Sequence, residues 1–172
     1  EYVLSQPADG YTILAIPDYA VTVAVGANPH GLENFKPIAR IQKDIMTIQV
    51  KADGPYADIH ELFQAAKENP GKITIGGVGA ASIEELAVQQ MNKELGIQFN
   101  FIPYDDAAQM HAALLGGHID SIMEEIGPTI GLIQEGLIKI LLVWNEERLE
   151  DFPDVPSSVE NGWNLTDGMT RG

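Results

Sequence analysis

Apolar and polar positions along the chain follow two alternating patterns. Short β-rich runs occur at 11–16, 45–51, 73–75, 98–102, 119–123 and 138–144. Apolar residues at helical spacing predict helices at 59–69, 83–95, 107–115 and 128–136, with a further short helix at 19–25. Because parallel neighbouring strands need crossover connections, this order predicts an α/β fold with a mostly parallel sheet flanked by helices.

The run at 45–51 alternates strictly between apolar and polar residues. It places Met46, Ile48 and Val50 on one face and Thr47 and Gln49 on the other. Such alternation is typical of a strand with one buried and one solvated face. We therefore expect a half-buried strand here.

Three helix starts carry capping signals. Asp58 with Glu61, and Ser82 with Glu85, have the spacing of a capping box, and Asp105 or Asp106 precedes the helix at 107–115. For the helix after Ser82 the sequence predicts an end at Gly96 and an apolar stripe formed by Ile83, Leu86, Ala87 and Met91.

The junction between the strand at 73–75 and the next helix is rich in glycine. Gly76, Gly77 and Gly79 let backbone N–H groups approach a ligand, and the first helical turn presents unpaired amides carrying partial positive charge. The junction therefore suggests an anion-binding loop, although glycines that only pack a helix tightly against a strand would look the same. In parallel sheets ligands bind outside the carboxyl ends of the strands, which here precede the loops 17–19, 76–82, 103–106 and 123–127.

Composition and charge exclude several kinds of partner and site. The 172 residues carry a formal net charge of −15, which opposes contact with nucleic acid or anionic lipid. Cysteine is absent, so disulfides and thiol catalysis are excluded. The chain begins without an initiator Met, and we expect it to be a processed or excised piece of a longer protein.

The titratable residues give no pattern for catalysis or metal binding. His111 and His118 are separated by Gly116-Gly117, and no His-Glu-x-x-His spacing occurs, so we expect no metal site. The pairs Asp105-Asp106 and Glu124-Glu125 are typical of helix caps and solvated faces. We expect no catalytic residue and no cofactor.

Short motifs resemble a known family and occur in its order along the chain. They are Asp9-Gly10-Tyr11-Thr12, 35–39 (FKPIA), 69–72 (NPGK), Gly77-Val78-Gly79 with Leu86-Ala87, Ile102-Pro103-Tyr104, 113–120 (ALLGGHID), and Arg148 with 153–156 (PDVP) and Glu160-Asn161-Gly162. Together they resemble the extracytoplasmic solute-binding proteins of tripartite tricarboxylate transporters, also called the TctC or Bug family.

The resemblance implies a type II periplasmic-binding-protein fold. Two α/β lobes would close on a small organic carboxylate in the periplasm and deliver it to membrane permease subunits. The first lobe would be largely missing: 1–39 would be a partial first-lobe segment, 40–145 the second lobe, and 146–172 the hinge and the return towards the first lobe. Exposed first-lobe strands could then pair with another copy of the chain.

The resemblance also implies the ligand-binding residues. They are Asp18, Tyr19, Gly77, Val78, Gly79, Ala80, Ala81, Ser82, Tyr104 and Asp105. The family usually has serine at the position of Ala80 and often histidine at that of Glu85. If Glu85 faces the cleft it would repel a dicarboxylate, whereas if it only caps its helix nothing follows for the ligand.

Two alternatives keep the same fold class. A transferase could hold phosphate in the glycine loop with Asp105 or His118 as base, but no Gly-x-Ser-x-Gly elbow and no phosphate-loop lysine are present. The effector-binding domain of a transcription regulator shares the fold, but it would need a basic DNA-reading element that this chain lacks.

Overall fold

The chain forms two compact units. The structure, a computed structural model, describes residues 1–15, 23, 26, 28–166 and 168–171. Unit 1 comprises Glu1–Asp44 with Met169–Gly172, and unit 2 comprises Ile45–Gly168. Of the sequence predictions, Asp18, Tyr19 and almost all of the helix at 19–25 lie outside the described residues.

Unit 1 contains little regular structure in its described part. It holds the 3₁₀ helices η1 (Val3–Ser5) and η2 (Leu32–Asn34), and strand β1 (Gln42–Asp44) pairs antiparallel with β7 (Met169–Arg171). The strand predicted at 11–16 is wrong over 11–15, where no strand forms and Tyr11 is 92% exposed. A strand needs a neighbour for its backbone hydrogen bonds, and none lies beside this segment among the described residues.

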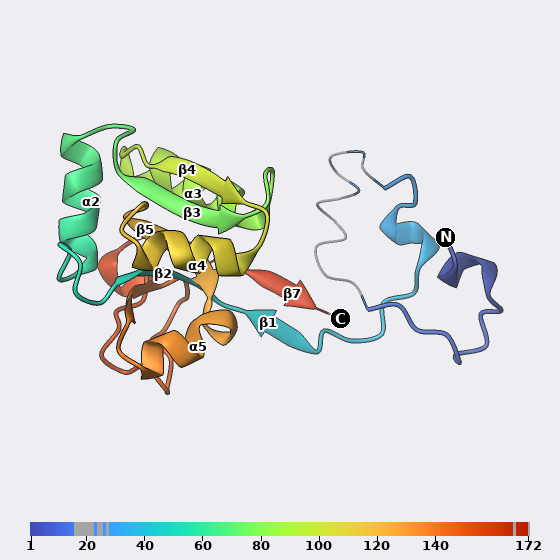
Figure 1. The fold of residues 1–172 in the computed structure, drawn as a ribbon. Coiled ribbons are helices and arrows are strands. Elements are labelled where there is room, and N and C mark those ends of the chain that lie inside the picture. The colour runs from blue at the N-terminus through green and yellow to red at the C-terminus, as the bar shows by residue number, and fades with distance from the viewer. Residues whose placement is uncertain (16–22, 24–25, 27, 167, 172) are drawn as a thin grey trace. The chain divides into compact units, whose positions relative to one another are not determined.

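Unit 2 is built on a mixed five-stranded sheet of order β4-β3-β5-β2-β6 (Figure 1). Its strands are β2 (Met46–Lys51), β3 (Thr74–Val78), β4 (Asn100–Tyr104), β5 (Ser121–Glu125) and β6 (Ile138–Val143). β3 runs parallel to both β4 and β5, whereas β2 runs antiparallel to both β5 and β6. All strands except β2 therefore point in one direction, as expected for a mostly parallel sheet.

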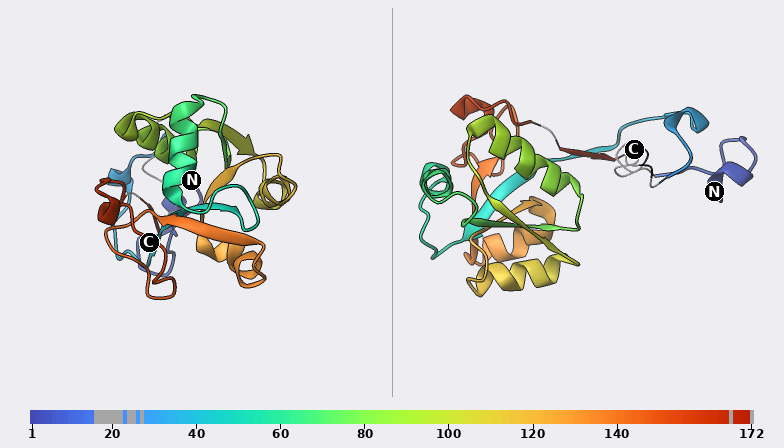
Figure 2. Two further views of the ribbon diagram at one scale, coloured as in Figure 1. Left: turned by 90° about the vertical axis from the view of Figure 1, so that its left-hand side faces the viewer. Right: turned by 90° about the horizontal axis from the view of Figure 1, so that it is seen from above.

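Helices cover both faces of this sheet (Figure 2). α2 (Ile59–Glu68) and α3 (Ile83–Leu95) pack with one hydrophobic cluster, and α4 (Ala107–Leu115) and α5 (Ile126–Gln134) pack with the other. The capping box at α2 is confirmed, because Asp58 accepts from the Glu61 amide and Glu61 accepts from the Ala57 amide. Gly96 ends α3 in the left-handed conformation with φ 62°, also as predicted.

The half-buried prediction for β2 is wrong. Thr47 and Gln49 are both 0% exposed, as buried as Met46 and Ile48 on the other face. β2 lies in the interior of the sheet with helices on both faces, so neither side of the strand meets water.

The buried stripe of α3 also differs from the prediction. Leu86 is 50% exposed, and the buried positions are Glu84, Ala87, Val88 and Met91. These four positions keep helical spacing, but the buried face of α3 includes Glu84 and leaves out Leu86. The Glu84 Cβ packs against the backbone of Gly77 in β3, where a side chain would leave no room for it.

The segment after β6 packs back onto unit 2. It contains the 3₁₀ helix η3 (Val159–Asn161), and Ser157 forms a bridge with Val143 at the end of β6. Arg148 donates two hydrogen bonds to the Glu160 carboxylate, which holds this irregular segment together. Among the helices of the described ranges, none is long and apolar enough to cross a bilayer.

Candidate functional site

The carboxyl ends of three parallel strands meet at one edge of the unit 2 sheet. We call the segments that follow β3, β4 and β5, at 78–82, 104–106 and 124–127, the carboxyl edge. α3, α4 and α5 all begin there, so the positive ends of their dipoles point to the same edge. The described residues predicted to bind ligand, from Gly77 to Ser82 with Tyr104 and Asp105, lie at this edge.

Two of the glycines in β3 have a packing role. A Cβ on Gly76 would lie 2.8 Å from Ile119 Cδ1, and a Cβ on Gly77 would lie 2.7 Å from the Phe101 ring. The following turn passes through left-handed conformations at Gly79 (φ 81°) and at Ala81 (φ 54°). A non-glycine residue in this region costs roughly 1–2 kcal/mol, a strain that is concentrated at ligand-binding and other functional sites.

Protein acceptors already occupy two amides of the glycine loop. The Gly79 N–H donates to the Tyr104 carbonyl at 2.8 Å, and the Ala81 N–H donates to Glu85 Oε2 at 2.7 Å. Ser82 Oγ accepts from the Glu85 amide at 3.3 Å, so Ser82 caps α3 and Glu85 bonds back to the turn before it. Within the described part of the chain the amides of Ala80 and Ser82 have no protein acceptor, and Ala80 is exposed.

The start of α5 offers further amides that the sequence reasoning missed. Its N-cap residue, Glu125, makes no side-chain capping bond. Among the described residues nothing accepts from the N–H groups of Ile126 and Gly127, and Pro128 has no N–H. The available signal was Pro128 three residues after the end of β5, a residue typical of the first turn of a helix.

Tyr104 and Asp105 have different environments. The Tyr104 ring is partly buried and packs against the cluster under α4. Asp105 is exposed, and it is Asp106 that caps α4 by accepting from the Gln109 amide at 2.9 Å. The open choice between the two aspartates is thus resolved, and Asp105 remains at the surface of the carboxyl edge.

Glu124 contradicts the expectation of a solvated acidic pair. It is 3% exposed, and its Oε2 lies 2.6 Å from His111 Nε2 on α4. Burial raises the pKa of the Glu124 carboxyl, the hydrogen bond and charge of His111 oppose that rise, and repulsion by Glu125 and Glu84 adds to it. The Glu124 side chain points to the face of the sheet that α4 covers. Its surroundings therefore differ from those of its sequence neighbour Glu125.

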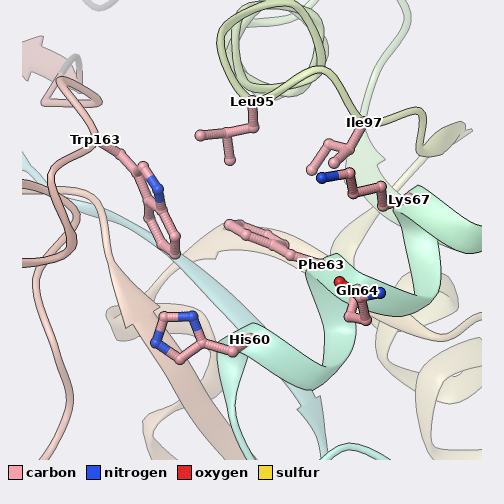
Figure 3. A pocket seen from close by; sticks show the side chains of 7 residues that line it. All are labelled: His60, Phe63, Gln64, Lys67, Leu95, Ile97 and Trp163. Carbon is pink, nitrogen blue, oxygen red and sulfur yellow. The ribbon is translucent and has the colours of Figure 1, made fainter.

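Two hollows in the described part of unit 2 lie along α2 rather than at the carboxyl edge. The one shown in Figure 3 has a volume of about 240 Å³. It is lined by His60, Phe63, Gln64, Lys67, Leu95, Ile97 and Trp163. The Trp163 and Phe63 rings lie 5.0 Å apart between centroids, so this groove is where the segment after β6 anchors on α2.

The described residues show no arrangement for metal binding. No group of three or more His, Asp or Glu side chains among them is placed to hold an ion. The main-chain amides at the carboxyl edge can donate hydrogen bonds, which suits a carboxylate oxygen.

The family follows from a match over nearly the whole chain. Residues 2–170 match the family described as "Tripartite tricarboxylate transporter family receptor", TctC. The chain belongs to this family. The match agrees with the resemblance of the sequence motifs.

Individual relatives are consistent with this membership. The "UPF0065 protein in gbd 5'region" of Cupriavidus necator is 31% identical over 160 residues, covering 92% of this chain and 49% of that protein. The chain spans about half the length of the curated relatives it matches.

Solved TctC structures share the fold. A ligand-free TctC solute-binding protein from Polaromonas is 30% identical with a TM-score of 0.85, and the match covers 99% of this chain and 59% of that one. MatC from Rhodopseudomonas palustris with bound malate is 20% identical with a TM-score of 0.76, covering 99% and 60%. The predicted binding-protein-like α/β fold is confirmed, and the chain spans 59% and 60% of the length of these two structures.

Proposed function

We propose that this chain is the carboxylate-binding part of an extracytoplasmic solute-binding protein. In this proposal the whole protein captures a small organic carboxylate in the periplasm and delivers it to the permease subunits of a tripartite tricarboxylate transporter. Family membership supports the transport role, and the malate bound to MatC supports the ligand class.

The observation that carries the proposal is the set of unpaired amides at the carboxyl edge. Ala80 and Ser82 before α3, and Ile126 and Gly127 in the first turn of α5, have N–H groups without acceptors in the described chain. Such amides at helix starts bind carboxylate oxygens without any cationic side chain. Gly77, Val78 and Gly79 would shape the loop, and Tyr104 and Asp105 would flank it.

The lobes are assigned as part of the same proposal. Unit 2 corresponds to the second lobe, and residues 1–39 contribute to the first. In this proposal the second lobe also includes 146–166, which belong to unit 2, and the hinge lies at the connections next to β1 and β7.

Association with a second copy stays a prediction of the sequence. Unit 1 exposes Tyr11 and Ile13 to 92% and 70%. Exposed apolar side chains of this kind are available for contact with another surface.

The test is an amide-resolved NMR titration of the chain with malate, because chemical shifts report weak binding and its location together. We expect the amide signals of Ala80, Ser82, Ile126 and Gly127 to move with malate concentration. Absence of shifts at these positions, or shifts confined to the groove along α2, would contradict the proposed site.

A pair of variants at Ile126 isolates one donor. Ile126 is the first helical residue after an extended Glu125 (ψ 164°), a position that tolerates proline, so Ile126→Pro removes the N–H together with the side chain. We expect Ile126→Pro to weaken malate binding roughly tenfold, since a hydrogen bond to a charged group is lost. Ile126→Ala keeps the amide and should bind like the wild type; equal affinities of the two variants would exclude this amide as a ligand contact.

A further inference from the structure

A buried pair of titratable side chains, His111 and Glu124, lies next to the junction between β5 and α5. His111 Nε2 of α4 and Glu124 Oε2 of β5 are 2.6 Å apart, and the two side chains are only 14% and 4% exposed. One proton shared between an imidazole and a carboxylate leaves such a pair without net charge. Removal of that proton leaves an uncompensated negative charge in the interior.

The main chain of the same residue is held from β2. Thr47 Oγ1 donates to the Glu124 carbonyl oxygen at 2.8 Å, and Gln49 Nε2 donates to Thr47 Oγ1 at 2.8 Å. Glu124 immediately precedes Glu125, the N-cap of α5. Its side chain and backbone together therefore fix the position at which α5 and its free amides begin.

The surroundings of Glu124 make a second negative charge costly. His111 is the cationic partner, while Glu84 of α3 and Glu125 at the end of β5 both act on Glu124 by repulsion. Burial is the largest cause of its raised pKa. Gln49 Oε1 nearby is buried without a donor among the described residues.

We propose that the single proton shared by His111 and Glu124 positions the β5–α5 junction, and that its loss as the pH rises loosens the junction and weakens carboxylate binding. The part that concerns binding rests on the proposed function. A carboxyl whose pKa is raised in the folded state stabilises that state at low pH, and this contribution is lost as the pH rises through the raised pKa.

The first experiment measures hydrogen-exchange protection of the Ile130 and Gly131 amides, the first to bond within α5, between about pH 6 and about pH 9, above the ordinary pKa of a glutamate. We expect wild-type protection to fall roughly tenfold relative to the β3 amides of the same sample, a coupling of the size usual between linked sites. Glu124→Gln keeps the shape of the side chain without the titration and should show no fall. Glu135→Gln, at an exposed glutamate after α5, is the matched control and should behave like the wild type.

A second pair of variants tests the role of His111. Glutamine at 111 places an amide donor near the position of Nε2, whereas alanine provides none. We expect His111→Ala to lower protection of the junction at neutral pH and His111→Gln to restore most of it. The same pH profile in the wild type and in Glu124→Gln, or full protection in His111→Ala, would overturn the proposal.

The ligand measurement separates this inference from the function on which it rests. With malate as the probe, we expect wild-type affinity to fall roughly fivefold to tenfold over the same pH range and that of Glu124→Gln to stay constant. If the wild type and Glu124→Gln bind malate with the same pH dependence, the inference fails while the proposed function stands. If the wild type binds no malate at any pH, the function fails for this ligand, and the exchange profile still decides the inference.

Discussion

At the carboxyl edge, the short distances between neighbouring residues decide what each of them does. Gly77 lies below the Glu84 Cβ and beside the Phe101 ring, so its bare backbone sets how closely α3 approaches β3. Glu85, one residue further along, bonds the Ala81 amide instead of a ligand. Glu84 therefore packs against β3, and Glu85 bonds the turn before α3. In the proposed function, main-chain amides bind the carboxylate of the ligand.

Gly77→Ala should destabilise unit 2. The new Cβ would lie 2.7 Å from Phe101 and 2.9 Å from the Glu84 Cβ, so both neighbours must move. We expect the free energy of unfolding to fall by about 1–3 kcal/mol, measured by urea denaturation. Gly131→Ala in α5 is the control, because nothing lies within 4 Å of its Cβ, and it should gain about 0.5–1 kcal/mol. A stable Gly77→Ala variant would show that the close approach of α3 is not required.

At the scale of elements, the helices of unit 2 differ in how their first turns are satisfied. α3 and α4 are capped by Ser82 and Asp106, whereas α5 has no side-chain cap. A side-chain cap satisfies an amide of the first helical turn, whereas an uncapped start leaves those amides free to donate to another acceptor. The difference singles out α5 as the helix whose start depends most on its surroundings, here on Glu124 and β2.

Ser82→Ala should lower the stability of the ligand-free chain by about 1 kcal/mol, because the Glu85 amide loses its side-chain acceptor. Thermal or urea unfolding followed by far-UV circular dichroism measures the change. Asp105→Ala removes an exposed side chain that caps nothing and should stay within about 0.5 kcal/mol of the wild type. Equal stabilities of the two variants would count against a structural role for the Ser82 hydroxyl.

At the scale of the whole molecule, the hydrophobic core belongs to one unit. The buried apolar residues of the described chain all fall between Met46 and Leu165, and most of them belong to two clusters on the two faces of the unit 2 sheet. Burial of apolar surface is the dominant stabilising contribution in folding. Unit 1 has no comparable cluster among its described residues.

A chain of residues 45–168 should therefore fold by itself. We expect its urea midpoint to match that of the 172-residue chain, with the near-ultraviolet dichroism of the buried Trp144 retained. A fragment ending at 145 is the informative comparison, since it lacks Trp163 and Leu165, which pack against α2 and its neighbours. Failure of 45–168 to fold cooperatively would show that unit 1 contributes to stability in a way the core does not reveal.

Local features were determined by the sequence alone. The capping boxes, the bounds of α4, the end of α3 at Gly96 and the alternation of strands and helices were all predicted, because each depends on residues within one or two turns of each other. The family was recognisable for a similar reason, since its motifs are short and lie in order along the chain.

Only the tertiary structure decided which faces are buried and which groups meet. The position of β2 inside the sheet buries Thr47 and Gln49, and the predicted strand does not form over 11–15, where no neighbouring strand lies among the described residues. His111 meets Glu124 because α4 crosses the face of the sheet to which that side chain points. Burial, pairing and the supply of free amides depend on what lies beside a segment in space, and a one-dimensional pattern of apolar and polar residues does not specify that neighbour.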